Sequence, residues 1–324
     1  PPLYYFHGEI GPDLGLAVSG CGPPSGGRKQ FPIRKRSTMN RRAFIIESAM
    51  AAAASLPVAV GAAEPKPPGI KVTILGNAGA IPEVGHEAAC FLINGKHLVD
   101  AGYCGVLRMR QYGFDPLALE SITFTHFHMD HYLGLPQLLF YLGLRGRKGP
   151  PFQISGPREH LESIVNTAVE FLRIDEFPEL KVDYRLLPLS PGDTFELSGL
   201  HMETFAARHV SGKNRPEPAL VYKATDTAGG AVLAFTGDTH FHPPTADFFK
   251  GAHLLIHDAA HTPIKDVVGI AQKAEVGKLL LIHHPPSKSK GLLETARSVF
   301  PNTEIAEEGK TFEIPAIRRE ASAA

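Results

Sequence analysis

The chain has 324 residues, of which 43% are hydrophobic and 20% charged, and its formal net charge is zero. A chain of this kind can bury a large apolar core, and its balanced charge gives no sign of a nucleic-acid-binding surface. Its three cysteines, Cys21, Cys90 and Cys104, include no CxxC pair, which excludes a thiolate zinc ribbon. Cys90 and Cys104 either form one disulfide in an oxidising compartment or remain two buried thiols.

The N-terminal part of the chain is predicted to lie outside the folded domain. Residues 1–38 are rich in proline and glycine, which indicates a non-native or mis-set extension. Residues 39–63 place paired arginines, Arg41 and Arg42, before a short alanine-rich stretch that ends in small residues. This order is typical of a twin-arginine signal peptide, whereas the alternative is an alanine-rich helix of the mature protein. We therefore expect export to the periplasm, no stable membrane anchor after cleavage, and a mature domain over 64–324.

Apolar runs and turn residues predict the order of elements in this domain. Strands are expected at 70–75, 89–93, 97–100, 121–125, 152–155, 182–187, 194–197, 201–206, 219–224, 231–236, 254–257 and 279–282. Helices are expected at 106–112, 131–144 and 159–171, within 260–275, and at 291–300. Several strands come first and strands alternating with helices follow, in two similar halves. This order predicts two stacked sheets with helices outside, an αββα sandwich.

Four polar side chains follow the predicted strand 121–125 within six residues: His126, His128, Asp130 and His131. In an extended segment, residues two apart point to the same side, so His126 and His128 can bind one metal ion. Asp130 and His131 come where the chain turns into a helix, and therefore point to a second position nearby. The alternative is a loop of surface histidines, in which these four side chains would lie close together without a functional role.

The segment THFHMDH, residues 125–131, resembles the HxHxDH signature of the metallo-β-lactamase superfamily. The resemblance extends from the loop 75–82 to the C-terminal region, and it implies the four-layer αββα fold. It also implies three further metal ligands, each of which follows an apolar strand: His209, Asp238 and His283. His284 is the rival of His283 for the last position.

The resemblance implies two metal ions, which the ligands divide between them. His126, His128 and His209 belong to one ion, Asp130, His131 and His283 belong to the other, and Asp238 bridges both. Imidazole and carboxylate suit two Zn²⁺, although Mn²⁺ or Fe²⁺ also accepts them. Zinc lowers the pKa of its bound water to about 7, which gives a hydroxide nucleophile at neutral pH. We expect a metal-dependent hydrolase with no Ser, Cys or Lys nucleophile, in which Asp130 counts among the catalytic residues.

The C-terminal half looks most like the ribonuclease Z and phosphodiesterase branch, on the segments 235–239, 254–260 and 276–285. In that branch an acidic residue and a histidine assist the leaving group. Asp258 and His261 match these positions, although the spacing is shorter and Thr-Pro rather than Ser-Thr follows the histidine. The two residues are therefore either catalytic or structural.

The expected bond is that of a phosphodiester, a phosphotriester or a related ester, and the expected substrate is a small molecule, in the first place an anionic ester. No long Gly/Pro/Lys-rich arm separates His131 from Asp238, and export would remove the enzyme from tRNA, so no nucleic-acid partner is expected. The basic loop 145–151 is either a solvated turn or a segment that attracts an anionic substrate. A lactonase or β-lactamase acting on a cyclic acyl bond is the alternative function. A third possibility is a non-catalytic metal-binding protein, but the complete ligand set argues against it. A homodimer is a further expectation for the assembly of the protein.

Overall fold

The described residues, 69–81, 83–211 and 215–317 of a computed structural model, form two seven-stranded sheets and a two-stranded ribbon. The expected extension 1–38 and signal peptide 39–63 lie outside these residues. Among the described helices, none has the length and apolar character that a membrane span requires.

The first sheet contains the N-terminal strands and one strand from the C-terminal end of the domain. Its order is β16 (Thr311–Ile314), β1 (Ile70–Gly76), β2 (Cys90–Ile93), β3 (His97–Val99), β4 (Ser121–Thr123), β5 (Phe152–Pro157) and β6 (Tyr184–Leu189). Strands β3 to β6 are parallel. Their connections contain α1 (Gly105–Gln111), η1 (Pro116–Ala118), α2 (Met129–Tyr132), α3 (Gly134–Leu144), α4 (Arg158–Phe171) and η2 (Pro178–Leu180).

The second sheet has the order β15 (Thr303–Ile305), β14 (Lys278–Ile282), β13 (Leu254–Asp258), β12 (Val232–Phe235), β11 (Leu220–Asp226), β8 (Leu200–Ala206) and β7 (Thr194–Leu197). Strands β12 to β15 are parallel. Their connections contain α5 (Thr245–Phe248), α6 (Ile264–Lys273), η4 (Pro286–Lys288) and α7 (Ser289–Arg297). The ribbon consists of β9 (His209–Ser211) and β10 (Arg215–Glu217).

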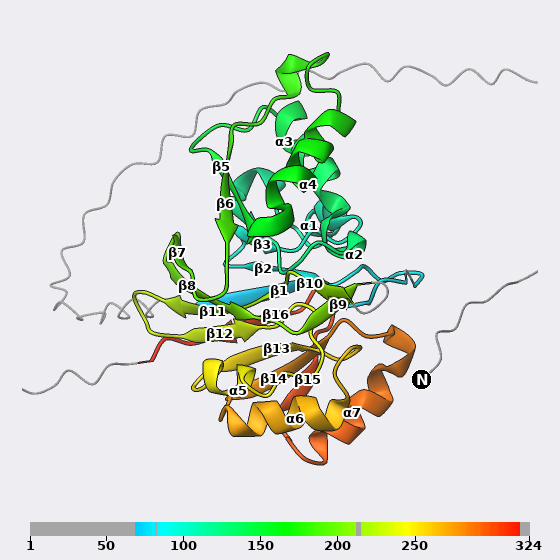
Figure 1. Cartoon of the computed structure of the whole chain (residues 1–324), viewed down its shortest axis with the longest axis vertical. Coiled ribbons are helices and arrows are strands. Elements are labelled where there is room, and N and C mark those ends of the chain that lie inside the picture. Colours follow the sequence, from blue (N-terminus) through cyan, green and yellow to red (C-terminus); the bar gives the residue numbers. More distant parts are fainter. Residues whose placement is uncertain (1–68, 82, 212–214, 318–324) are drawn as a thin grey trace, which may run out of the picture. The chain divides into compact units, whose positions relative to one another are not determined.

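Three apolar cores separate four layers. One core lies between the two sheets, one lies between the first sheet and helices α1, α3 and α4, and one lies between the second sheet and helices α5 to α7. In β3, Leu98 packs against the helices and Val99 packs between the sheets, as the alternation of side chains along a strand requires. Figure 1 shows the two helix layers on opposite outer sides of the stacked sheets. The predicted αββα sandwich is confirmed.

The structure differs from the predicted elements in its short segments. The helix expected at 131–144 is divided at Leu133 into α2 and α3, and the strand expected at 182–187 begins two residues later. The sequence did not predict α5, β9, β10, β15 or β16. Cys90 and Cys104 are both free thiols, and Cys90 is buried.

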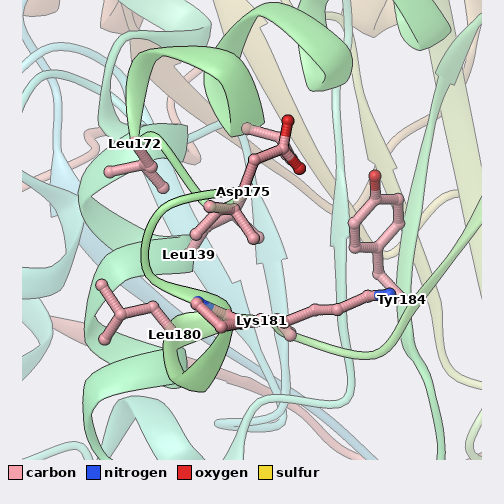
Figure 2. A pocket seen from close by; sticks show the side chains of 10 residues that line it. Leu139, Leu172, Asp175, Leu180, Lys181 and Tyr184 are labelled. Atoms are coloured by element: carbon pink, nitrogen blue, oxygen red, sulfur yellow. The ribbon is translucent and has the colours of Figure 1, made fainter.

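A cavity of about 380 Å³ lies between α3, the end of α4, η2 and β6. Figure 2 shows Leu139, Leu172 and Leu180 on its apolar side and Asp175, Lys181 and Tyr184 as its polar groups. None of its lining residues is a predicted metal ligand, so this cavity is separate from the candidate site.

Candidate metal centre

The predicted ligands lie where parallel strands of both sheets end. His126 and His128 follow β4 of the first sheet, Asp238 follows β12 of the second, and His283 follows β14 directly. The carboxyl ends of parallel strands are where α/β sheets place their ligand-binding residues. Here the ends of two stacked sheets supply one shared site.

A glycine permits the close approach of these two strand ends. Gly237 has a φ of +53°, and a Cβ at this position would lie 2.4 Å from the Cβ of Thr125. A contact this short is sterically forbidden, and the left-handed backbone also disfavours other residues. Gly237 therefore lets the loop that carries Asp238 pack against the loop that carries His126.

The first ligand group consists of His126, His128, His209 and Asp238. Nε2 of His209 lies 2.9 Å from Nδ1 of His128 and 3.9 Å from Oδ2 of Asp238. Nε2 of His126 lies 3.8 Å from the same carboxylate oxygen. Tetrahedral ligands bound to zinc at about 2.1 Å are separated from each other by about 3.4 Å. The four side chains therefore leave room for one ion between them.

The second ligand group consists of Asp130, His131 and His283, with Asp238 beside them. Nε2 of His283 lies 3.2 Å from Oδ2 of Asp130 and 3.3 Å from Oδ2 of Asp238. Nε2 of His131 lies 3.4 Å from Oδ2 of Asp130 and 3.4 Å from Oδ1 of Asp238. Asp238 thus contacts both groups, so the structure brings together all seven predicted ligands in the predicted division.

Buried polar atoms without partners show that the groups fit a cation. Nε2 of His126, Nε2 of His131 and Oδ1 of Asp238 are buried and accept or donate no hydrogen bond among the described residues. Leaving one such atom unsatisfied costs about 1–3 kcal/mol. A divalent cation is an acceptable partner for two imidazole nitrogens and a carboxylate oxygen, and this donor set suits zinc, manganese or iron.

Hydrogen bonds behind the ligands fix which imidazole nitrogen faces the site. Nδ1 of His131 donates to Oδ2 of Asp100 at 2.8 Å, and Thr125 donates to Asp100 through its amide and its hydroxyl. Nδ1 of His126 lies 3.1 Å from the Thr125 hydroxyl. Both imidazoles therefore direct Nε2 into the site. Sequence reasoning missed Asp100, although an acidic residue directly after an apolar strand is the same signal that marked Asp238.

Asp258 lies behind the second group and contacts two histidines. Its Oδ1 lies 3.3 Å from Nδ1 of His283, and its Oδ2 lies 3.1 Å from Nδ1 of His261. The amides of Thr239, Ala260 and His261 also donate to this carboxylate. Asp258, His261, His283 and Asp238 are close enough to hold a cation, but the Asp258 oxygens already have these donors. Asp258 is therefore better placed to orient the two histidines than to bind a metal.

His261 lies at the solvent side of the site. Its side chain is 30% exposed, and its Nδ1 is 3.6 Å from Oδ2 of Asp238. Its ring stacks on that of His283, with centroids 5.3 Å apart.

His284, the rival of His283, directs Nδ1 to the carbonyl of Pro285 and belongs to none of the ligand groups among the described residues. The geometry therefore favours His283.

The two ligand groups differ in protonation before a metal binds. Burial lowers the pKa of His126 far below its usual value, and it lowers the pKa of His209 to about 4. Burial also opposes the charge on His283, but Asp238, Asp130 and Asp258 outweigh it and raise the pKa to about 10. The pKa of His131 is raised in the same way, by Asp238 and Asp100. The imidazoles of His126 and His209 are thus neutral at pH 7, whereas a metal must displace protons from His131 and His283.

Comparisons with known proteins agree with this fold. The chain is 24% identical over 306 residues to a ribonuclease Z of Methanosarcina acetivorans, covering 76% of this chain and 98% of that protein. The metallo-beta-lactamase fold protein YhfI from Bacillus subtilis superposes with a TM-score of 0.62 at 21% identity, over 76% of this chain and all of that one. The short form of human tRNase Z has a TM-score of 0.61 at 20% identity, over 76% and 99% of the chains. The last two similarities show the shared fold.

The protein is a metal-dependent hydrolase of the metallo-β-lactamase superfamily, in its ribonuclease Z-like branch. This assignment follows from the stacked sheets, from the histidine and aspartate groups at their common edge, and from these relatives. Residues 70–300 match the family described as Anti-Pycsar protein Apyc1, and the chain belongs to this family. The expectation of no nucleic-acid partner is at odds with the relatives, whose names are those of ribonucleases.

Proposed function

We propose that this hydrolase cleaves phosphodiester bonds at a centre of two divalent metal ions. His126, His128 and His209 would hold one ion, Asp130, His131 and His283 would hold the other, and Asp238 would bridge them. The observation that carries this proposal is the position of Asp238, whose Oδ1 faces His131 at 3.4 Å while its Oδ2 lies 3.8 Å from His126. When bound, two such ions supply a nucleophile at neutral pH and neutralise charge that develops on phosphoryl oxygens.

His261 would protonate the oxygen of the leaving group. Its Nδ1 is engaged by Asp258 at 3.1 Å, which leaves Nε2 as the nitrogen that can carry a proton to a substrate. Burial lowers the pKa of His261, but the Asp258 carboxylate outweighs this effect and raises the pKa above its usual value. A general acid needs its proton at the working pH, so Asp258 both orients His261 and keeps it protonated.

The substrate would be a small phosphodiester. The names of ribonuclease Z relatives support cleavage of a phosphodiester, because RNA is a polymer joined by such bonds. The formal net charge of zero supports a small ester over a long polyanion, since proteins that grip nucleic acid concentrate basic residues. RNA as the substrate is one outcome of the test that follows.

The test compares hydrolysis rates of the metal-loaded full chain on an aryl phosphodiester, a short RNA, a homoserine lactone and a chromogenic β-lactam. We expect turnover of the phosphodiester and its loss in Asp238→Ala. Asp226→Asn is the matched control, because Asp226 is also buried but caps a turn away from the ligand groups. Turnover of RNA alone would replace the small ester by a nucleic acid. Turnover of the lactone or β-lactam alone would contradict phosphodiester cleavage and leave Asp258 and His261 as structural groups.

A further inference from the structure

A second cavity, of about 310 Å³, opens between the two sheets at the edge opposite the metal centre. Its walls include the first residues of parallel strands, such as Ser121 in β4, whereas the metal ligands follow the last residues of such strands. The β7–β8 hairpin of the second sheet, residues 196–198, lines its other side. A water molecule occupies about 30 Å³ in the liquid, so the cavity has room for a ligand of roughly ten water volumes.

One row of side chains crosses the floor of this cavity. His97 pairs with Ser121, Ser121 pairs with Gln153, and Gln153 pairs with Arg185 on four neighbouring strands. Residues paired in this way point to the same face of a sheet. In β3 that face is also the face of Val99, which belongs to the core between the sheets. The row is therefore a polar interruption of an otherwise apolar layer.

Two residues that line the cavity each have a buried hydrogen-bond donor without an acceptor among the described residues. Gln153 is only 4% exposed, and its Oε1 accepts a hydrogen bond from Arg185 at 2.5 Å, but its Nε2 has no partner among the described residues. Arg147 donates through its two terminal nitrogens to the carbonyls of Pro150 and Leu119, while its buried Nε has no partner there either. Such orphaned donors are costly unless a ligand or water supplies an acceptor.

The charge of the lining also favours an acceptor. Within the described part of the chain, neither Arg147 nor Arg185 has a carboxylate within 4.0 Å. The two acidic residues in the wall already have partners, since Glu120 pairs with Lys96 at 2.8 Å and Glu196 contacts His201 at 2.6 Å. Asp183 and Glu120 act on Arg147 only through space. The cavity therefore presents two guanidinium groups without contacting carboxylates of their own.

We propose that this cavity binds a small oxyanion, a phosphate or carboxylate group, through Arg147, Gln153 and Arg185. Guanidinium groups match the oxygens of both chemical groups through paired N–H donors. The basic loop 145–151 would then help to bind an oxyanion in this cavity. From the sequence it was either a solvated turn or a segment that attracts an anionic substrate. The loop precedes the first residue of β5, and its residues Arg147, Pro150 and Pro151 line this cavity.

The test is calorimetric titration of the metal-loaded full chain with inorganic phosphate and with acetate, at constant ionic strength. Phosphate can also bind at the metal centre, so variants must separate the two events. We expect Arg185→Gln to weaken one binding event at least tenfold. Gln153→Glu should abolish it, because this substitution supplies a built-in carboxylate. The exposed Arg110→Gln is the matched control, since Arg110 lies on α1 and outside the cavity.

A folding defect and a true binding loss are distinguished by thermal unfolding without anion. We expect Gln153→Glu to unfold at or above the wild-type temperature, because it reduces uncompensated positive charge. Arg147→Gln is the second variant if either fails to fold. Stronger phosphate than acetate binding would assign a phosphate ester, and the reverse would assign a carboxylate ligand. Binding of neither probe, or binding that these variants weaken no more than Arg110→Gln does, would overturn the proposal.

Discussion

The carboxylate of Asp100 accepts a hydrogen bond from Nδ1 of His131 at 2.8 Å, and the two residues are 31 positions apart in the sequence. Asp100 has a φ of +53°, a left-handed conformation that aspartate and asparagine tolerate better than most residues. The same carboxylate binds the Thr125 amide at 2.8 Å. Asp100 therefore ties the end of β3 to the segment that carries four of the predicted ligands.

We predict that Asp100→Asn lowers metal affinity by about 10–100-fold, the usual effect of losing a hydrogen-bond partner of a metal-binding histidine. Asparagine keeps the left-handed backbone, so the substitution tests the carboxylate rather than the fold. Competition with a chelator measures the affinity, and Asp226→Asn is the control for a buried aspartate. Equal affinities in the two variants would contradict the role of Asp100.

We predict that His261→Ala slows cleavage of a phosphodiester with an alkoxide leaving group by about 10²–10⁴-fold, the range typical of general acid catalysis. An aryl phosphodiester should be much less affected, because a good leaving group needs no proton. His240→Ala is the control, since the His240 ring lies near those of His261 and His209, but its Nδ1 contacts the carbonyl of Arg208 and no carboxylate among the described residues. Equal losses on both substrates would assign His261 a structural role.

Metal binding should release protons, because His283 has a pKa of about 10 in the metal-free protein. At pH 8 its imidazolium must lose about one proton to become a ligand, so metal affinity should rise with pH until it passes this pKa. Calorimetry in buffers of different ionisation enthalpy counts the protons, and His283→Gln should reduce the count. No proton release in the wild type would contradict the raised pKa.

The same pKa predicts how stability depends on pH without metal. The folded-state pKa of His283 is raised above the unfolded value of about 6.5. Its stabilising contribution is therefore complete below pH 6.5 and is lost as the pH rises through about 10. We expect the unfolding temperature of the metal-free protein to fall over this window, and His283→Gln to flatten the fall. An unchanged slope in the variant would show that other groups cause it.

Gly237→Ala should destabilise the protein more than Gly251→Ala. Both glycines have positive φ, and the left-handed backbone costs alanine about 1–2 kcal/mol at either position. Only at Gly237 would the added Cβ also collide with Thr125, whereas nothing lies within 4 Å at Gly251. We expect a further loss of about 1–3 kcal/mol and a lower metal content for Gly237→Ala. Similar unfolding temperatures and metal contents would contradict the close packing of the two loops.

Export remains a prediction, because residues 39–63 lie outside the described part of the chain. We propose that Arg41 and Arg42 direct the chain through the twin-arginine route, which carries folded proteins. A reporter fused to residues 39–63 should reach the periplasm, and replacement of both arginines by lysine should retain it in the cytoplasm. Periplasmic delivery that survives the replacement would rule out this route.

Most strands were predictable from the sequence, including the short edge strand β7, whereas the edge strands β15 and β16 were not. The strand expected at 194–197 coincides with β7, and the expected strands at 254–257 and 279–282 are β13 and β14. The four-residue β16 becomes a strand because it pairs with β1, which lies at the other end of the domain in sequence. No local sequence pattern predicts this pairing. Tertiary pairing, rather than propensity, decides such segments.

The ligand set was predictable for a different reason: four members cluster directly after one apolar strand, and the resemblance to the metallo-β-lactamase superfamily implied the other three. The side chains His126 to His131 are neighbours in sequence, but Asp238 and His283 meet them only because parallel strands end at one edge. The partners behind the ligands were harder to predict. The contact of Asp100 with His131 depends on the turn of α2, and the cavity at the opposite edge depends on the stacking of two sheets.

Whether two metal ions share Asp238 is decided by the metal content of the purified full chain. After loading with zinc or manganese and removal of excess metal, the wild type should hold about two ions per chain, the number a bridged pair requires. Asp238→Ala should hold fewer than two and lose phosphodiester turnover, while Asp226→Asn should retain both. One ion per chain in the fully active wild type, or an Asp238→Ala variant that keeps two ions, would contradict the bridged centre.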